Sequence, residues 1–214
     1  MLTKKDLENL DVNEIVQKVP KLFDYGYYIY FYGSNNKEEL ASIFNEIDST
    51  KPSNSNLVKR THKERKNYFK SNVFLVDTES KQIDIAFVTK FQEFDRKKHF
   101  MYVLFNNYLS TLVNERIRET KGLAYTANST MVYPNYPDES YFQYTKLGTQ
   151  TDKFKEALKI NYDLLKNMPI EESVFSQVKL RRQALLNSQR IVKNASLYHY
   201  EKSINKGMDY DDRK

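Results

Sequence analysis

The sequence predicts an α+β fold, in which helices cover one face of an antiparallel β-sheet. Strand-like segments and segments with the three- and four-residue apolar spacing of helices occur in separate runs, which favours this class. Two strand-like runs separated by turn residues also stand between long helical runs, and they are typical of a hairpin. The 214 residues are 40% hydrophobic and 29% charged, so the chain can bury a core of one domain or slightly more.

The first 48 residues predict a helix, a strand and a second helix. DLENLDVNEIVQKV has apolar residues at helical intervals, and NNKEELASIFNEI has the same pattern. Between them, residues 25–33 (YGYYIYFYG) form a glycine-bounded run of aromatic and β-branched residues that predicts a strand. Three elements are too few for a domain, and the Ser, Asn and Pro content of residues 49–56 indicates a linker after them.

After the linker, residues 73–77 and 82–91 are strand-like and close in sequence, so we expect an antiparallel pair. A long helix is predicted next. Its apolar stripe comprises Met101, Leu104, Phe105, Tyr108, Leu109, Leu112, Val113 and Ile117. Gly122 follows Lys121 and has the position of a helix C-terminal cap, where a left-handed residue lets the chain reverse.

A hairpin and two more helices complete the predicted order. LAYTANSTMVYP and SYFQYTKLGTQ predict the two strands of the hairpin, separated by the PNYPDE loop. Thr149 and Asp152 resemble a capping box before a helix. The stripe of that helix comprises Phe154, Leu158, Tyr162, Leu165 and Met168. Pro169 separates it from a third helix, predicted from about Glu171 to Lys206 and ended by Gly207.

Composition excludes several classes of protein. The absence of cysteine excludes disulfides, thiolate zinc clusters and a cysteine nucleophile. The net charge of +6 comes largely from residues 59–70, which hold six basic residues against Glu64 alone. This run follows a linker, so we interpret it as a solvated segment and expect no nucleic-acid partner. The N-terminus lacks a continuous apolar run and predicts neither a signal peptide nor a membrane span, and the compartment is unknown.

Catalytic motifs are also missing, so we expect no catalytic residue and no metal ligand in this chain. His62, His99 and His199 each lack a second histidine three or four residues away, which excludes the usual helical zinc motifs. Five glycines cannot supply a phosphate-binding loop, and there is no G-x-S-x-G motif.

Arg118 and Tyr125 remain as candidate substrate-binding residues. By position alone, Arg118 lies in the last turn of a helix and Tyr125 early in a strand, where each residue type is common for structural reasons. The reversal at Gly122 could nevertheless bring the guanidinium and the phenol to one edge of the sheet. Such a pair can hold a peptide carbonyl and donate hydrogen bonds to a developing oxyanion.

The run LFNNYLSTLVNERIRETKGLAYTANSTMVYPNYPDESYFQYTKLGTQTDKFKEAL resembles the C-terminal homologous domain of pitrilysin/insulinase-type zinc metallopeptidases, which include the mitochondrial processing peptidases. In these, an Arg-x6-Tyr unit within a segment like R-E-x-x-G-L-A-Y precedes a hairpin, a G-T-Q-like strand end and two helices. The resemblance covers about residues 66–212. It departs from the family at NNYLST, which replaces a glycine-rich turn that many members carry before the helix.

The resemblance implies a function for the candidate pair. Members are clam-shaped endopeptidases whose zinc motif lies in an N-terminal domain, so zinc is expected in that domain of a parent protein and not here. The C-terminal domain closes over the peptide and supplies the Arg and Tyr that match Arg118 and Tyr125. This chain is then a non-catalytic part that encloses and positions a peptide substrate, and alone it should be inactive. The alternative is a structural or binding homologue whose parent has no peptidase activity.

The resemblance also implies a domain organisation. Residues 1–48 are expected to be the tail of a preceding domain, residues 49–66 a linker, and residues 67–214 most of a C-terminal domain that lacks its last elements. A sheet without its last strand exposes an edge. We therefore expect that residues 25–33 fill the vacant place, or that two chains associate through the shortened sheet.

Overall fold

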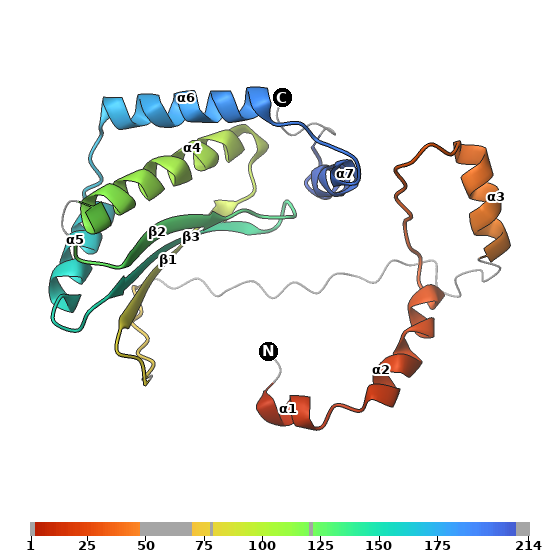
Figure 1. The fold of residues 1–214 in the computed structure, drawn as a ribbon, viewed down its shortest axis with the longest axis horizontal. Helices are drawn as coiled ribbons and strands as arrows, with labels where there is room; N and C mark the ends of the chain where they lie inside the picture. The colour runs from red at the N-terminus through yellow and green to blue at the C-terminus, as the bar shows by residue number, and fades with distance from the viewer. Residues whose placement is uncertain (1–2, 48–69, 78, 120–121, 209–214) are drawn as a thin grey trace. The chain divides into compact units, whose positions relative to one another are not determined.

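A computed structural model describes residues 3–47, 70–77, 79–119 and 122–208 (Figure 1). Internal contacts divide the chain into two compact units, Met1–Lys63 and Glu64–Lys214. We describe each unit by itself. The expected assignment of these parts to two domains and a linker stays a prediction.

The first unit contains short helices. They are α1 (Lys4–Glu8), α2 (Val12–Lys18), the 3-10 helix η1 (Pro20–Asp24) and α3 (Lys37–Ile47). The segment expected to form one helix before residue 20 is thus two helices, because Asp11 starts α2 by accepting a hydrogen bond from the Asn13 amide at 2.8 Å. Helix α3 is confirmed. It begins where Asn36 Oδ1 accepts from the Glu39 amide at 2.7 Å.

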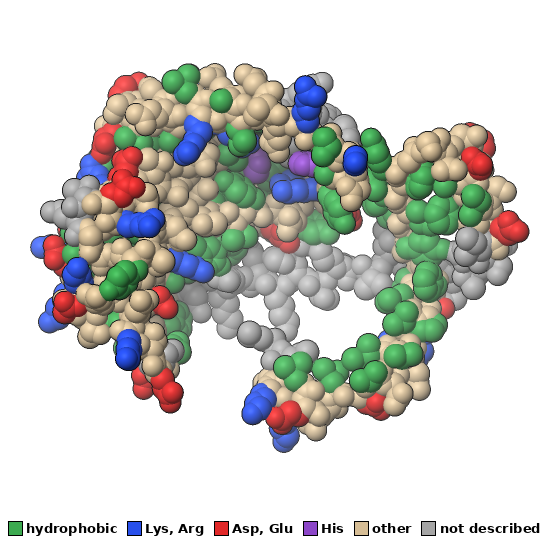
Figure 2. Space-filling model, in the orientation of Figure 1, with side chains coloured by type: hydrophobic (Ala, Val, Ile, Leu, Met, Phe, Trp, Pro, Cys, Tyr) green, Lys and Arg blue, Asp and Glu red, His purple; other side chains and the backbone are tan. Residues whose placement is uncertain are grey.

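None of the described side chains of the first unit is buried. Apolar side chains are therefore visible along this unit in Figure 2. The predicted strand over residues 25–33 is wrong, since residues 26–32 belong to no strand. Alternation of apolar residues gives a segment the composition of a strand, but a strand exists only where a neighbour completes its hydrogen bonds.

The second unit is built on a three-stranded antiparallel sheet. Its strands are β1 (Ile83–Glu93), β2 (Thr126–Val132) and β3 (Ser140–Thr149), in the order β1-β3-β2. The β2–β3 hairpin is confirmed, with Thr126 opposite Gly148 and Val132 opposite Phe142. The expected pairing of residues 73–77 with β1 is wrong, because residues 73–77 form no strand and β1 pairs with β3. Residues 25–33 contribute no strand to this sheet either.

Within the described part of this unit, four α-helices and one π-helical segment accompany the sheet. They are α4 (Arg96–Val113), the π-helix η2 (Asn114–Glu119), α5 (Phe154–Lys166), α6 (Glu172–Ser188) and α7 (Ala195–Asn205). Helices α4 and α6 lie on the same side of the sheet in Figure 1, with α4 in contact with β2 and α6 in contact with α4. The α+β class is therefore confirmed.

The core joins the helices to the inner face of the sheet. Its buried residues are Tyr108, Leu109, Leu112, Val113, Ile117, Leu123, Ala124, Ala127, Leu147, Ala157, Leu164, Val174 and Val178. The predicted stripe of α4 supplies most of its helical members, although Met101 is 56% exposed. Helix α5 buries Ala157, Asn161 and Leu164, which lie outside the predicted stripe. Of that stripe, Leu165 and Met168 pack against the core and Tyr162 is exposed.

The last predicted helix is two helices, α6 and α7, separated by residues 189–194. Lys193 in this connection has φ of 47°, a left-handed conformation that interrupts a helix. The predicted end at Gly207 is confirmed. Gly207 has φ of 65°, its amide donates to the Ile204 carbonyl, and the Met208 amide donates to the Ser203 carbonyl, which is the pattern of a Schellman cap.

Candidate functional site

Arg118 lies in the π-helical continuation of α4. A π-helix is rare because its hydrogen bonds span one residue more than those of an α-helix, and short π segments are frequent at functional sites. Ile117 is fully buried in the core, and the next side chain, Arg118, is exposed. The buried isoleucine thus anchors the turn that presents the arginine to solvent.

The two arginines of this segment have different surroundings. Arg116 forms a charged hydrogen bond with Glu171, the residue at the start of α6. Asn114 donates to Glu119 Oε1 at 3.0 Å, so that carboxylate is also engaged. The Arg118 side chain has no hydrogen bond or ion pair with any residue that the structure describes. The guanidinium donors are therefore not used by any described residue.

The chain reverses at Gly122, as the sequence predicts. Gly122 has φ of 56°, and its amide donates to the Arg118 carbonyl at 3.1 Å, which is the single bond of a left-handed helix cap. The Leu123 amide then donates to the Ile117 carbonyl at 3.1 Å. The backbone that carries Arg118 and the backbone that leads to Tyr125 are thus joined by two hydrogen bonds.

Tyr125 is the residue immediately before β2. Its amide donates to the Gly148 carbonyl at 2.8 Å, which adds one bond to the β2–β3 pairing. Its side chain is 55% exposed, and the phenol oxygen accepts a hydrogen bond from Nε2 of Gln150. The phenol is therefore accessible to solvent and yet held at its tip by a neighbouring side chain.

The end of β3 fastens the turn between Arg118 and Tyr125. The Thr149 hydroxyl donates to the Leu123 carbonyl at 2.6 Å, and Lys153 Nζ donates to the Gly122 carbonyl at 3.2 Å. The Gly148 carbonyl accepts from the Tyr125 amide, and a Cβ at Gly148 would lie 2.6 Å from Oγ1 of Thr126, the residue opposite it in β2. The G-T-Q strand end, Gly148 to Gln150, thus makes one hydrogen bond per residue to the turn or to Tyr125.

Two of these contacts were not expected. The sequence pattern predicts a capping box at Thr149, but α5 begins at Phe154 without a side-chain cap, and the Thr149 hydroxyl donates to the Leu123 carbonyl instead. Gln150 has no local motif. Only the hairpin register, which places the residues after Gly148 opposite those before Thr126, could indicate its contact with Tyr125.

His99 and Tyr141 form a contact that lies away from Arg118 and Tyr125. His99 Nδ1 and the Tyr141 hydroxyl are 3.0 Å apart near the start of β3, the opposite end from Gly148. Burial of Tyr141, which is fully inaccessible, raises its pKa to about 12. This pair belongs to an aromatic cluster in which Tyr102 stacks on Tyr141 at 4.2 Å, and its position indicates a packing role. His62 lies outside the described residues.

The described residues do not fit a zinc ion. No group of three or more His, Asp or Glu side chains among them could hold a metal. We therefore derive no step of chemistry through a metal from this chain. In the same described ranges, none of the helices has the length and apolar character that crossing a bilayer requires.

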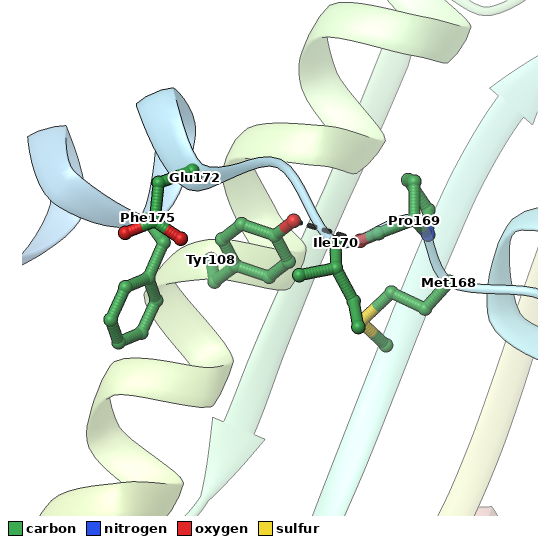
Figure 3. Close-up of a pocket in the computed structure, with 6 residues that line it drawn as sticks. All are labelled: Tyr108, Met168, Pro169, Ile170, Glu172 and Phe175. Atoms are coloured by element: carbon green, nitrogen blue, oxygen red, sulfur yellow. Dashed lines mark hydrogen bonds between the residues drawn. The ribbon is translucent and has the colours of Figure 1, made fainter.

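One pocket, of about 530 Å³, lies at the connection between α5 and α6. Its lining is mainly apolar, and Figure 3 shows the Tyr108 side chain between Phe175 and the Met168–Ile170 segment. The Tyr108 hydroxyl donates to the Pro169 carbonyl at 2.8 Å and accepts from the Glu171 amide at 2.8 Å. The ionisable residues among its lining are Tyr108 and Glu172, and the Tyr108 hydroxyl is already engaged by these two backbone groups.

The fold and the corner formed by Arg118, Gly122 and Tyr125 define an α+β domain with an exposed, unpaired arginine and an anchored phenol. Comparison with protein families identifies the class. The family described as "Peptidase M16 inactive domain" matches residues 27–181, more than half of the chain, and the chain belongs to this family. The matched segment includes Arg118, Tyr125 and Gln150. No curated protein matches the chain significantly.

Membership confirms the family that the R-E-x-x-G-L-A-Y segment indicated. The chain is a non-catalytic C-terminal domain of the M16 peptidases. The roles of Arg118 and Tyr125 stay predictions.

Proposed function

We propose that this chain encloses a peptide substrate and positions it opposite a zinc-bearing N-terminal domain of the same protein, with Arg118 and Tyr125 as the contacts. The observation that carries the proposal is the pair of arginines at the end of α4. Arg116 has a carboxylate partner in α6, whereas Arg118, two residues later, has no described partner and faces solvent. An arginine held on a rigid turn with unused donors suits recognition of a carbonyl or carboxylate group.

The chemistry of the pair is that of hydrogen-bond donation. The guanidinium can hold the carbonyl oxygens of an extended peptide, and the phenol can donate to the oxygen that becomes negative when that carbonyl is attacked. Such donors act best when their positions are fixed before the reaction. The Ile117 anchor below Arg118 and the hydrogen bonds from Thr149 and Gln150 support a fixed arrangement. The metal and the general base would belong to the partner domain.

The test is peptide cleavage by the protein that carries both domains. Fluorescein-labelled casein serves as the probe, with and without a zinc chelator. We expect chelator-sensitive cleavage, and we expect Arg118→Ala and Tyr125→Phe to lower kcat/KM by about a hundredfold each without a matching loss of stability.

Two other outcomes would contradict the proposal in different ways. If both variants cleave as fast as the wild type, the arginine and the tyrosine do not contact substrate. If the intact protein shows no cleavage at all, the chain is a structural or binding homologue, which is the alternative that the sequence analysis leaves open.

A further inference from the structure

Gln150 donates its side-chain amide N–H to the phenol oxygen of Tyr125. We propose that Gln150 is a positioning residue that fixes Tyr125 as a hydrogen-bond donor toward the carbonyl oxygen of a bound peptide, an inference that rests on the function proposed above. Gln150 itself does not touch the peptide. It sets the direction in which the tyrosine hydroxyl can act.

The hydrogen bond between Gln150 and Tyr125 has a defined polarity. A tyrosine hydroxyl can donate one hydrogen bond and can also accept, whereas an amide NH₂ group only donates. When Gln150 Nε2 donates, the phenol oxygen is the acceptor, and the phenolic hydrogen stays unused by Gln150. A hydroxyl that already accepts a hydrogen bond is also polarised and becomes a better donor. The contact therefore prepares the phenol to donate to a carbonyl oxygen or an oxyanion.

The backbone on both sides of this contact is fixed. Tyr125 is tied to Gly148 through its amide, and Thr149, between Gly148 and Gln150, is fully buried and bonded to Leu123. The Gln150 carbonyl accepts from the Lys153 amide at 3.1 Å. Only the Tyr125 ring, which is 55% exposed, would sample several rotamers if its tip were released. Gln150 thus restricts a side chain of this corner that the backbone does not hold.

The decisive variant is Gln150→Glu, which keeps the size of the side chain and reverses the hydrogen bond. A carboxylate can only accept, so it takes the phenolic hydrogen and leaves Tyr125 with no hydrogen for the substrate. In the two-domain protein with fluorescein-labelled casein, we expect Gln150→Glu to lower kcat/KM about as much as Tyr125→Phe. Gln150→Ala, which frees the ring but leaves its hydrogen, should lower it less. In a Tyr125→Phe background, Gln150→Glu should cause no further loss.

A second measurement separates this role from a loss of folding. In the 214-residue chain labelled with ¹³C at tyrosine Cζ, the Tyr125 resonance is identified by its absence from Tyr125→Phe. We expect Gln150→Ala to move that resonance and Gln150→Glu to move it further in the same direction, because the phenol loses an accepted hydrogen bond in the first variant and also donates one in the second. Other tyrosine resonances should be unchanged. Gln92→Glu is the matched control, because Gln92 is an exposed glutamine of β1 whose side chain contacts Lys98. It should change neither the spectrum of Tyr125 nor cleavage.

The outcomes distinguish the two proposals. If Tyr125→Phe loses activity and Gln150→Glu keeps the wild-type rate, the positioning role of Gln150 is wrong and the peptide-positioning function stands. If Tyr125→Phe itself keeps the wild-type rate, both are wrong. If Gln150→Glu lowers the rate further in the Tyr125→Phe background, Gln150 acts by another route, and its role through Tyr125 is overturned.

Discussion

The Thr149 hydroxyl donates a hydrogen bond of 2.6 Å to the carbonyl of Leu123, across a sequence separation of 26 residues. Thr149 is fully buried and Leu123 is only 5% exposed, so water cannot replace this bond. The contact ties the end of β3 to the turn between Arg118 and Tyr125. It therefore links the hairpin, which is local in sequence, to the presentation of the candidate site.

Thr149→Val should lower the free energy of unfolding by about 1–3 kcal/mol, because it leaves the buried Leu123 carbonyl without a donor. Urea denaturation of the 214-residue chain measures the change. Thr149→Ser keeps the hydroxyl and should recover part of the loss. Thr130→Val is the matched control, since Thr130 is an exposed residue of β2, and its effect should stay within about 0.5 kcal/mol. A loss as large in the control as in Thr149→Val would assign the effect to the sheet and not to this bond.

Gly122→Ala should lower the free energy of unfolding by about 1 kcal/mol. Gly122 has φ of 56°, a left-handed conformation that costs an L-residue with a Cβ about this much. No atom lies within 4 Å of a Cβ built there, so the cost comes from the backbone and not from a clash. Gly122→Asn separates a backbone cost from a steric clash, because asparagine is larger than alanine but tolerates the left-handed conformation better. Thermal or urea unfolding should place Asn between Gly and Ala, and an Asn variant less stable than Ala would point to a steric cause.

The parts of the fold that the sequence predicted correctly are those decided within a few residues. The β2–β3 hairpin carries its own turn residues, and Gly122 and Gly207 end helices by local conformation. Residues 73–77 have the composition of a strand but form none, and β1 pairs with β3. No proline or glycine lies between Glu172 and Asn205, so neither of the two strongest helix-breaking residues marks the break between α6 and α7.

The residues of the candidate site likewise fall into those that a local pattern predicts and those that it does not. Arg118, Gly122 and Tyr125 could be selected from a short segment because their spacing and the turn are local. Gln150 and Thr149 could not, since they meet the turn only after the hairpin has paired in its particular register. A capping-box pattern at Thr149 even favoured another role. Side-chain contacts that depend on register are the ones that a local pattern leaves open.

Tyr141 should make the folded chain less stable as the pH rises from about 10 to 12. In the unfolded chain this tyrosine ionises near its ordinary pKa of 10, whereas burial raises its pKa to about 12 in the fold. Between these values the unfolded state binds fewer protons than the folded state, so the free energy of unfolding falls with rising pH, by at most about 2–3 kcal/mol. Tyr141→Phe should flatten this decline, as measured by urea unfolding across the window. Tyr198→Phe, at a 72% exposed position, should leave the decline unchanged, and equal slopes in wild type and Tyr141→Phe would contradict the prediction.

Substitution of Arg116 should lower the stability of the fold, whereas substitution of Arg118 should lower peptide cleavage. Arg116→Ala removes the partner of Glu171 at the start of α6, and because this ion pair is partly exposed, the free energy of unfolding should fall by up to about 1 kcal/mol. Arg118→Ala removes a side chain with no described partner, so stability should stay within about 0.5 kcal/mol of the wild type. The two variants are a matched pair in residue type, helical segment and exposure.

Urea unfolding of the 214-residue chain compares the stability of the two variants. Casein cleavage by the two-domain protein compares their activity, and only Arg118→Ala should lose activity beyond its change in stability. If Arg116→Ala lowers cleavage as strongly as Arg118→Ala, the lack of a partner at Arg118 does not mark it for substrate, and a general effect of positive charge at this corner is the better account.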